Sequence, residues 1–320
     1  MRVNLAIFAI KSTKRQMQTS VSDMSLASIR GKRCAVVGLG LATDNVLTQK
    51  LADLGAEARH IIFSDGPVAA KDICHIDAFC PKDIATAIAG SDVIFSTASL
   101  MDFRPHEAEK VWAVNVGGMT NLSLAIEAAG VKRLIHCGSI LSLGHQTTEA
   151  PVDTHTAYQS DDRRTAVERS LFRQEMEAWR AAERGVSVTT VCAGWALGDT
   201  HTGHGSVLEE KLRRYLASGG RHVPPMESAF VSAEALASAL IGVWADGDDG
   251  ERLMCAGVNS TLAAVAEEMA RGMGLRGGVT ALTPRQTRLL LKMPASLSGH
   301  WLFDPHMGHL LTQKEHYRTE

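Results

Sequence analysis

Three groups of side chains have the types and spacing to do chemistry, and the first is a glycine turn. The sequence GLGL at 38–41 follows the apolar run RCAVV and precedes a helical pattern. Such a turn lets the backbone approach a phosphate, and the free N–H groups of the next helix attract anions. The third glycine of a GxGxxG motif would fall on Thr43, and the adjacent Asp44 would repel phosphates. We interpret Asp44 as the N-cap of that helix.

The other two groups contain histidines. Ser139 lies close in sequence to His136 and His145, which suggests a hydrolase, but no G-x-S-x-G elbow supports that interpretation. His201 and His204 could hold a metal from one loop, yet no cysteine or acid pair stands near them. We therefore expect solvated histidines and no metal site.

Two charged segments have simpler interpretations. Arg163-Arg164 could bind a phosphate, but we interpret it as an exposed pair near a helix start. The stretch LEEKLRRY at 208–215 is interpreted as a solvated helix face.

The elements that must position these residues alternate between strands and helices. Apolar strand-like runs occur at 33–40, 57–63, 91–99, 131–139 and 186–194, with helical patterns after 44, over 107–129 and over 165–184. This alternation predicts an α/β fold with a parallel sheet and helices on both faces, of the doubly wound dinucleotide-binding type.

Composition excludes several classes of protein. Hydrophobic residues make up 45% of the chain and charged residues 21%, and the formal net charge is -2. These values are typical of a folded domain and do not suggest a nucleic-acid partner. No apolar run is long enough to predict a transmembrane segment. The six cysteines form no C-x-x-C pair, so reduced thiols are expected.

The first 30 residues differ from the rest. They are basic, contain serine and threonine, and have Asp23 as their only acid. This is the composition of a mitochondrial transit peptide, so we expect an N-terminal extension over 1–30 and a mitochondrial location. The alternative is a cytoplasmic protein with a disordered tail or with translation starting at Met24.

Several segments resemble a known superfamily. DVIFSTAS (92–99), WAVNVGGMTNLSLAIEAAGVKRLIHCGSILSLG (112–144) and GVSVTTVCAGWALG (185–198) resemble the extended short-chain dehydrogenase/reductases. The nearest likeness is to the 3β-hydroxysteroid dehydrogenase and NAD-dependent epimerase/dehydratase group. Asn115 and Asn121 match that group's N-V-x-G-T-x-N helix, and FVSAEALASAL (230–240) and GERLMCAG (250–257) are similar to two later segments.

The resemblance implies a domain organisation. Residues 31–200 would form a Rossmann NAD(P)-binding-like domain, and 201–320 a smaller C-terminal substrate lobe. Within that lobe, 228–258 would return to the Rossmann core.

The resemblance also implies a mechanism whose central residues are missing. Family members use a tyrosine as general acid/base, a lysine four residues later and a serine or threonine on the substrate oxygen; positions i and i+4 share one helix face. Ser139 matches the family serine. The tyrosine and lysine positions fall on Val167 and Leu171, while Ser170 and Glu175 match their counterparts. The three tyrosines of the chain are not followed by a lysine four residues later, so no other register restores the pair.

A nucleotide site is implied as well, with NAD or NADP as the cofactor. The acid expected at the end of the second strand falls on Ile62, with Asp65 as a late substitute. The positions that the resemblance assigns to the cofactor are Gly38, Gly40, Leu41, Asp77, Thr97 and Ala98, with Asp77 facing the adenine.

These changes predict a degenerate dehydrogenase-like protein without standard hydride transfer. It would serve as a structural or accessory subunit, with other protein subunits as partners, or as a nucleotide-binding protein that senses the NAD(P) redox state. The alternative is an active NAD(P)-dependent oxidoreductase with non-standard catalytic groups, in which a water or Asp161 or Asp162 would act as the base.

Overall fold

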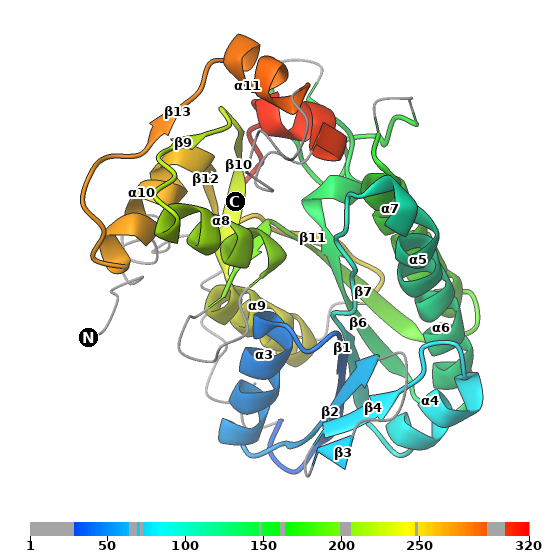
Figure 1. Cartoon of the computed structure of the whole chain (residues 1–320). Helices are drawn as coiled ribbons and strands as arrows, with labels where there is room; N and C mark the ends of the chain where they lie inside the picture. The colour runs from blue at the N-terminus through cyan, green and yellow to red at the C-terminus, as the bar shows by residue number, and fades with distance from the viewer. Residues whose placement is uncertain are drawn as a thin grey trace.

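The computed structural model describes residues 29–63, 69–70, 73–146, 149–160, 164–198, 206–246, 249–292 and 305–319. Figure 1 shows two parts, a larger one built on a central sheet and a smaller lobe above it.

The central sheet has eight strands in the order β11-β7-β6-β5-β1-β2-β4-β3. All its pairs are parallel except β3–β4 at the edge. From β1 the chain builds outward through β2 and β4, and then crosses to β5 on the other side, so the strand order reverses between β1 and β5. The strands are β1 (Arg33–Gly38), β2 (Glu57–Phe63), β3 (Ala69–Ala70), β4 (Ile73–Ile76), β5 (Val93–Ser96), β6 (Arg133–Ser139), β7 (Ser187–Ala193) and β11 (Arg252–Cys255).

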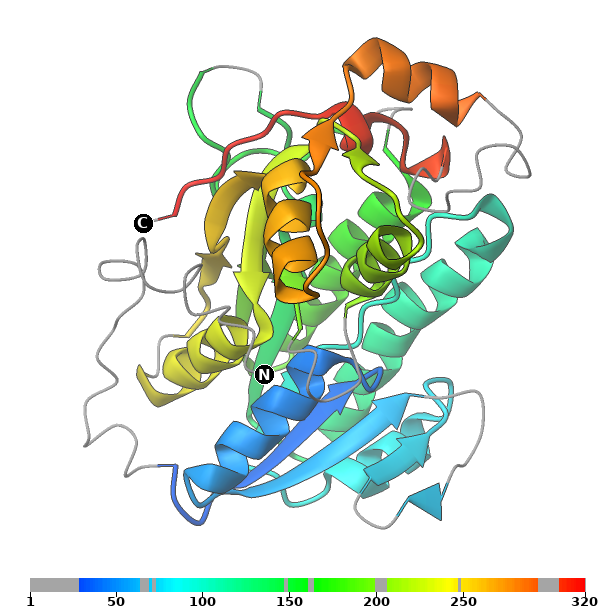
Figure 2. The same ribbon diagram turned by 60° about the vertical axis from the view of Figure 1, so that its left-hand side comes forward.

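Helices cover both faces of this sheet (Figures 1 and 2). On one face, α3 (Ala42–Asp53) and α9 (Ala233–Asp246) pack over a core that includes Val36, Leu47 and Leu240. On the other face, the core between the sheet and the helices includes Ile94, Ile126 and Ala178. The helices there are α4 (Pro81–Ile88), α5 (Ala108–Trp112), α6 (Gly118–Ala128) and α7 (Ala166–Ala182). The predicted doubly wound α/β fold is confirmed.

The helix expected over 107–129 is interrupted. A 3₁₀ turn, η1 (Pro105–Glu107), and α5 are followed by a π-helical turn, η2 (Ala113–Gly117), before α6 begins. Inside that turn the Asn115 side chain accepts a hydrogen bond from Leu100 N–H and donates to Leu100 C=O and Ser170 Oγ. A π-turn widens a helix locally, and here it holds Asn115 at the junction with α7.

The smaller lobe has a three-stranded sheet, β12-β10-β8, and a two-stranded one, β13-β9. Within 228–258, β10 pairs in the lobe, whereas α9 and β11 pack in the Rossmann half. The lobe's elements are β8 (Trp195–Leu197), α8 (Val207–Ala217), β9 (His222–Val223), β10 (Glu227–Ser232), β12 (Val258–Thr261), α10 (Leu262–Gly272), β13 (Thr280–Ala281), α11 (Pro284–Leu291) and the 3₁₀ segment η4 (Pro305–Thr312).

The C-terminal segment 305–319 packs back on the molecule. Tyr317 forms a bridge with Val152, and Lys314 forms one with Glu227. Figure 2 shows this segment crossing the lobe. Among the described helices, none has the length and apolar character needed to cross a bilayer.

Candidate functional site

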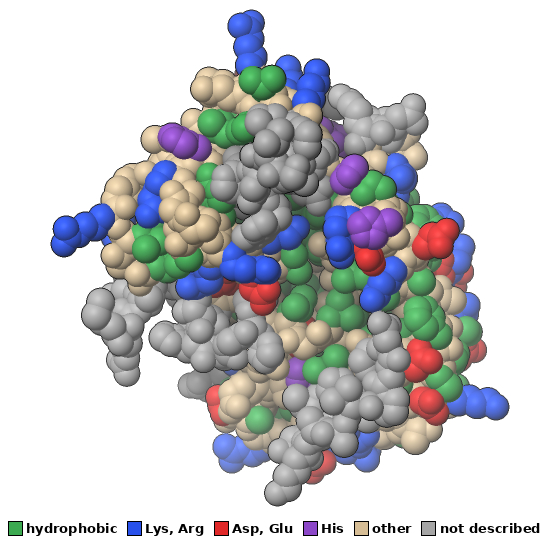
Figure 3. Space-filling view, viewed as in Figure 1, with side chains coloured by type: hydrophobic (Ala, Val, Ile, Leu, Met, Phe, Trp, Pro, Cys, Tyr) green, Lys and Arg blue, Asp and Glu red, His purple; other side chains and the backbone are tan. Residues whose placement is uncertain are grey.

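A cleft opens where the strand order of the central sheet reverses. It is lined by the start of α3, by residues following β5, by the ends of β6 and β7, by the start of α8 and by Met307 of η4. Its volume is about 1000 Å³ when the open mouth is included. Doubly wound proteins bind ligands at this place, outside the carboxyl ends of the strands. Figure 3 shows hydrophobic side chains in the middle of this face, between the lobe and the Rossmann half.

At one end of the cleft, the glycine turn holds an internal carboxylate. Asp44 is 1% exposed, and its Oδ2 accepts hydrogen bonds from Leu39 N–H (2.9 Å) and Leu41 N–H (3.0 Å). Leu41 is the N-cap of α3, so Asp44 is the third helical residue and not the N-cap that we expected. A Cβ built on Gly38 would lie 2.2 Å from Asp44 Oδ2, and therefore this carboxylate requires glycine there.

The environment of Asp44 has consequences for charge. Burial raises the pKa of this carboxyl, while hydrogen bonds from Thr97, Leu41 and Leu39 and the nearby His60 act in the opposite direction. A carboxylate that takes two N–H groups of the turn competes with a phosphate for the same donors and, when ionised, repels it.

The surroundings of the neighbouring glycine, Gly40, also differ from what the resemblance implies. Gly40 has φ +77°, a conformation that glycine adopts without strain, and its Cα faces Ile62, whose Cδ1 would lie 3.1 Å from a Cβ at position 40. An apolar side chain thus occupies the end of β2, where the family resemblance implied an acid. Asp65 lies outside the described residues.

At the other end of the cleft, Ser139 ends β6 and lines the wall. Its Oγ accepts a hydrogen bond from Leu141 N–H (3.2 Å) and caps η3 (Ile140–Ser142). The hydroxyl hydrogen can still be donated to a ligand, because that contact uses only a lone pair of the oxygen.

The two positions beside it on α7 are apolar and buried. Val167 and Leu171 are 0% and 2% exposed, belong to the same apolar cluster as Ile140 and Leu143, and do not line the cleft. The helix starts at a capping box in which Thr165 and Glu168 exchange hydrogen bonds, so its register is well defined. Val167 and Leu171 therefore contribute to the apolar packing of α7.

Polar residues on the same helix hold the surrounding framework. Ser170 Oγ accepts a hydrogen bond from Asn115 (2.9 Å). Glu175, which is fully buried, accepts one from Ser142 Oγ (2.7 Å) and pairs with Arg252 Nε (2.6 Å). These contacts tie α7 to η2, η3 and β11.

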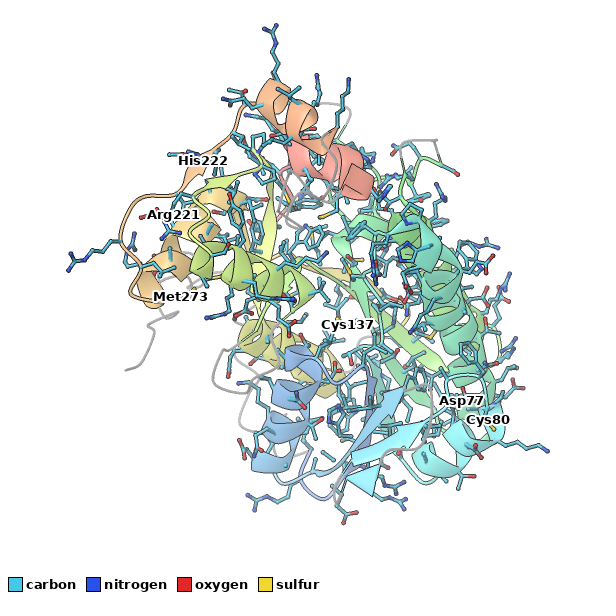
Figure 4. All side chains as sticks on the ribbon, viewed as in Figure 1. Asp77, Cys80, Cys137, Arg221, His222 and Met273 are labelled. Atoms are coloured by element: carbon cyan, nitrogen blue, oxygen red, sulfur yellow. The ribbon has the colours of Figure 1, made fainter. Side chains whose placement is uncertain are left out.

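The predicted cofactor residues differ in their relation to the cleft. Leu41 and Thr97 line it, but Asp77 and Ala98 do not. Asp77 accepts a hydrogen bond from Phe79 N–H in the loop before α4. Figure 4 shows Asp77 near α4, well away from Cys137 in the middle of the molecule.

Other sequence-based interpretations meet a mixed outcome. The prediction that Arg163-Arg164 is an exposed pair is wrong for Arg164. This side chain is 3% exposed and donates a hydrogen bond to Glu168 Oε1 (3.0 Å). Arg163, His201 and His204 lie outside the described residues. Burial lowers the pKa of His136 to about 4. The Nδ1 atom of His145 lies 2.7 Å from Glu315 Oε1, and the Ser139 hydroxyl contacts Leu141 N–H.

Several residues that line the cleft were not foreseen. The 208–215 stretch was expected to be a solvated helix face, yet Leu208 and Leu212 are buried and Lys211 lines the cleft. The leucine spacing was a usable signal. Met307 also lines the cleft, and no local pattern could have placed it there. Met101, Phe103 and Trp195 also line the cleft and were not predicted from the sequence.

Comparison with known proteins supports the assignment of the fold. Residues 56–169 match the 3-beta hydroxysteroid dehydrogenase/isomerase family. A 3-beta-hydroxysteroid dehydrogenase of Mycolicibacterium neoaurum is 30% identical over 128 residues, which cover 37% of this chain and 35% of that protein. Sterol demethylase protein B of Methylococcus capsulatus is 24% identical over 255 residues, covering 78% of this chain and 77% of that protein.

A solved structure shows the same fold. The Bordetella bronchiseptica enzyme WbmH, determined in complex with NAD+, superposes with a TM-score of 0.65 at 16% identity, covering 80% of this chain and 88% of that one. The chain therefore resembles the extended short-chain dehydrogenase/reductase superfamily, nearest its NAD(P)-dependent 3β-hydroxysteroid dehydrogenase and epimerase/dehydratase group, as the sequence predicted.

Proposed function

We propose that this protein is a degenerate relative of the NAD(P)-dependent dehydrogenases and epimerases that does not carry out standard hydride transfer. It serves as a binding protein or as an accessory subunit of a larger assembly.

The observation that carries this proposal is the environment of Val167 and Leu171. General acid/base catalysis needs a group that can exchange a proton and that reaches the substrate. These two side chains can do neither, because they are hydrocarbon and pack inside an apolar cluster, while Ser139 alone of the implied catalytic groups faces the cleft.

The residues around the glycine turn also support this proposal. Asp44 occupies N–H groups of the glycine turn, and Ile62 stands in place of an acid that would bind ribose hydroxyls. We infer that any NAD or NADP binds more weakly than in a complete dinucleotide site. The cofactor that does bind would then report the redox state without being consumed.

The proposed subunit role is based on the hydrocarbon side chains of Val167 and Leu171 and on the composition of the N-terminal residues. Residues 1–30 have the composition of a mitochondrial transit peptide, so we place the proposed assembly in mitochondria, with the cytoplasm as the alternative. Co-purification of the tagged full chain with a stable set of proteins would support this role, and a chain that elutes alone would oppose it.

The experiment that tests the nucleotide part is a titration of the full chain with NADH and NADPH. Binding is followed by nicotinamide fluorescence, by energy transfer from the five tryptophans and by calorimetric heat. Binding in the micromolar range without turnover supports a sensor. An absence of binding up to millimolar nucleotide removes the sensor and the dehydrogenase together and leaves a scaffold.

A second candidate is an active NAD(P)-dependent oxidoreductase with replacement catalytic groups. It is favoured by the position of Ser139, which shares the cleft wall with Thr97 and Lys211. The apolar lining and the two relatives with steroid or sterol names point to a sterol-like alcohol or ketone as its substrate. This candidate requires turnover that depends on the Ser139 hydroxyl.

A further inference from the structure

Three residues far apart in the sequence converge beside the start of α7. They are His145, Glu168 and His309, and one ligand atom from each lies within 4.8 Å of the others. Glu168 Oε1 is 3.3 Å from His309 Nε2 and 3.9 Å from His145 Nε2. The two imidazole rings are perpendicular, with centroids 5.2 Å apart.

The two imidazole donor atoms of this cluster are buried. Both Nε2 atoms are inaccessible to solvent and make no hydrogen bond with the described residues. Ligand atoms around a tetrahedral zinc ion, each about 2 Å from the metal, are about 3.3 Å apart. The Glu168–His309 separation already has this value, and the Glu168–His145 separation needs a closure of about half an ångström. The two imidazole donor atoms lie within 4.8 Å of each other and must also approach.

Surrounding groups orient two of the three ligands. His145 Nδ1 is 2.7 Å from Glu315 Oε1, an arrangement that fixes the ring and leaves Nε2 free to bind a metal. Glu315 is itself held by the Tyr317 hydroxyl (2.6 Å). Glu168 Oε2 accepts hydrogen bonds from the backbone N–H (2.7 Å) and the hydroxyl (2.8 Å) of Thr165.

One cation already contacts the cluster. Arg164 donates to Glu168 Oε1 at 3.0 Å, and it also donates to the carbonyl oxygens of Leu143 and Gln159. A carboxylate oxygen can accept more than one bond, so Arg164 orients Glu168 without using both lone pairs of Oε1. The carboxylates of Glu168 and Glu315 outnumber this one guanidinium, and the local charge favours a divalent cation.

We propose that His145, Glu168 and His309 form a binding site for a divalent transition metal of the zinc class. Imidazole nitrogens with one carboxylate oxygen suit zinc, and a water or another ligand would complete the coordination. Two of the ligands flank the start of α7 in sequence, while His309 belongs to the C-terminal segment. The metal would therefore fasten η4, and with it the cleft residue Met307, to the Rossmann half.

The test uses the full chain, freed of metal by a chelator and then given Zn²⁺ or Co²⁺ alone. We expect one bound equivalent by elemental analysis after gel filtration, the intense visible absorption of tetrahedral Co²⁺, and a melting temperature that rises with metal concentration. Glu315→Gln, which disturbs only an orienting residue, should weaken metal binding about 10–100-fold. His309→Ala, which removes a ligand, should weaken it further.

The matched control is His106→Ala, because His106 is an exposed histidine whose nearest acid, Glu107, is 3.6 Å away. It should bind metal as the wild type does. Wild-type protein without a bound equivalent, or a His309→Ala variant that keeps wild-type affinity, would overturn the proposal and identify the cluster as an ordinary His–Glu ion pair. The Co²⁺ spectrum of the wild type decides the question even if a variant fails to fold.

Discussion

Two pairs of residues on α7 differ in the contacts that they make. Ser170 and Glu175 match the family pattern and take part in buried hydrogen bonds that join α7 to η2, η3 and β11. Val167 and Leu171, which the resemblance places at the tyrosine and lysine positions, belong to an apolar core. The polar contacts that join α7 to its neighbours are in place, and under the proposed function the two reacting positions hold hydrocarbon side chains.

The glycine turn repeats this contrast. Its backbone geometry is that of a dinucleotide fold, with Gly40 at φ +77° and the turn leading from β1 into α3. Its N–H groups are taken up by Asp44 from inside the protein. Internal contacts of this kind can maintain the turn whether or not a ligand is bound.

The largest expected effect concerns the framework. Glu175→Ala leaves Arg252 without its carboxylate partner in a partly buried site, and breaking such a pair costs about 3–5 kcal/mol of unfolding free energy. Urea denaturation followed by circular dichroism measures this. Glu183→Ala, an exposed residue just past the end of the same helix, is the control and should change stability by less than about 0.5 kcal/mol. Equal losses in both variants would refute the framework role.

The next effect concerns a replaced position. Leu171→Ala should cost about 2–5 kcal/mol, because it leaves a cavity in the apolar cluster. Leu171→Met conserves volume and should cost less than about 1.5 kcal/mol. The same denaturation assay compares the two. If Leu171→Ala proved as stable as the wild type, Leu171 would not be the core residue that the contrast requires.

A smaller effect should appear at the glycine turn. Asp44→Asn keeps the side-chain shape but removes the charge near the phosphate site, and we expect NADH affinity to rise about tenfold. Calorimetry measures the change. Asp53→Asn, an exposed change at the far end of α3, should leave affinity unaltered. Weaker binding by Asp44→Asn would show that the carboxylate assists the nucleotide.

The smallest expected effect is a dependence of the C-terminal segment's stability on pH. Burial tends to raise the pKa of the Glu168 and Glu315 carboxyls. The contacts of Glu168 with His309 and Thr165, and those of Glu315 with His145 and Tyr317, outweigh this effect and leave both pKa values lowered. A lowered folded-state pKa gives stability that is present above the unfolded value and lost as pH falls through the folded one.

The C-terminal segment should therefore loosen below about pH 4.5, the ordinary value for glutamate. Hydrogen exchange of 305–319 at decreasing pH detects this. Unchanged protection of 305–319 at pH 3 would contradict the prediction that the ionised forms of Glu168 and Glu315 stabilise this segment.

The fold was predictable because its determinants are local and repeated. The apolar runs at 33–40, 91–99 and 131–139 indicate parallel strands, and their carboxyl ends must meet at one edge. Counting residues also shows that no tyrosine of the chain is followed by a lysine four residues later.

The rest of the site depends on contacts distant in sequence. Nothing near Met307 or His309 indicates that they reach the cleft and the start of α7. The π-turn at Asn115 depends on its contacts with Leu100 and Ser170. The residues next to Arg164 in sequence favour a surface position, but its guanidinium contacts Glu168 and the Tyr158 ring. Tertiary contacts of this kind override local propensity.

The most direct test of the central claim is hydride transfer itself. The full chain is incubated with NADH or NADPH and a panel of sterol-like and sugar-nucleotide ketones, and with the oxidised nucleotides and the matching alcohols, while nicotinamide absorbance is followed beside Ser139→Ala. We predict no turnover above the Ser139→Ala background. Turnover that the wild type shows and Ser139→Ala loses would contradict the account and establish an active oxidoreductase with replacement catalytic groups.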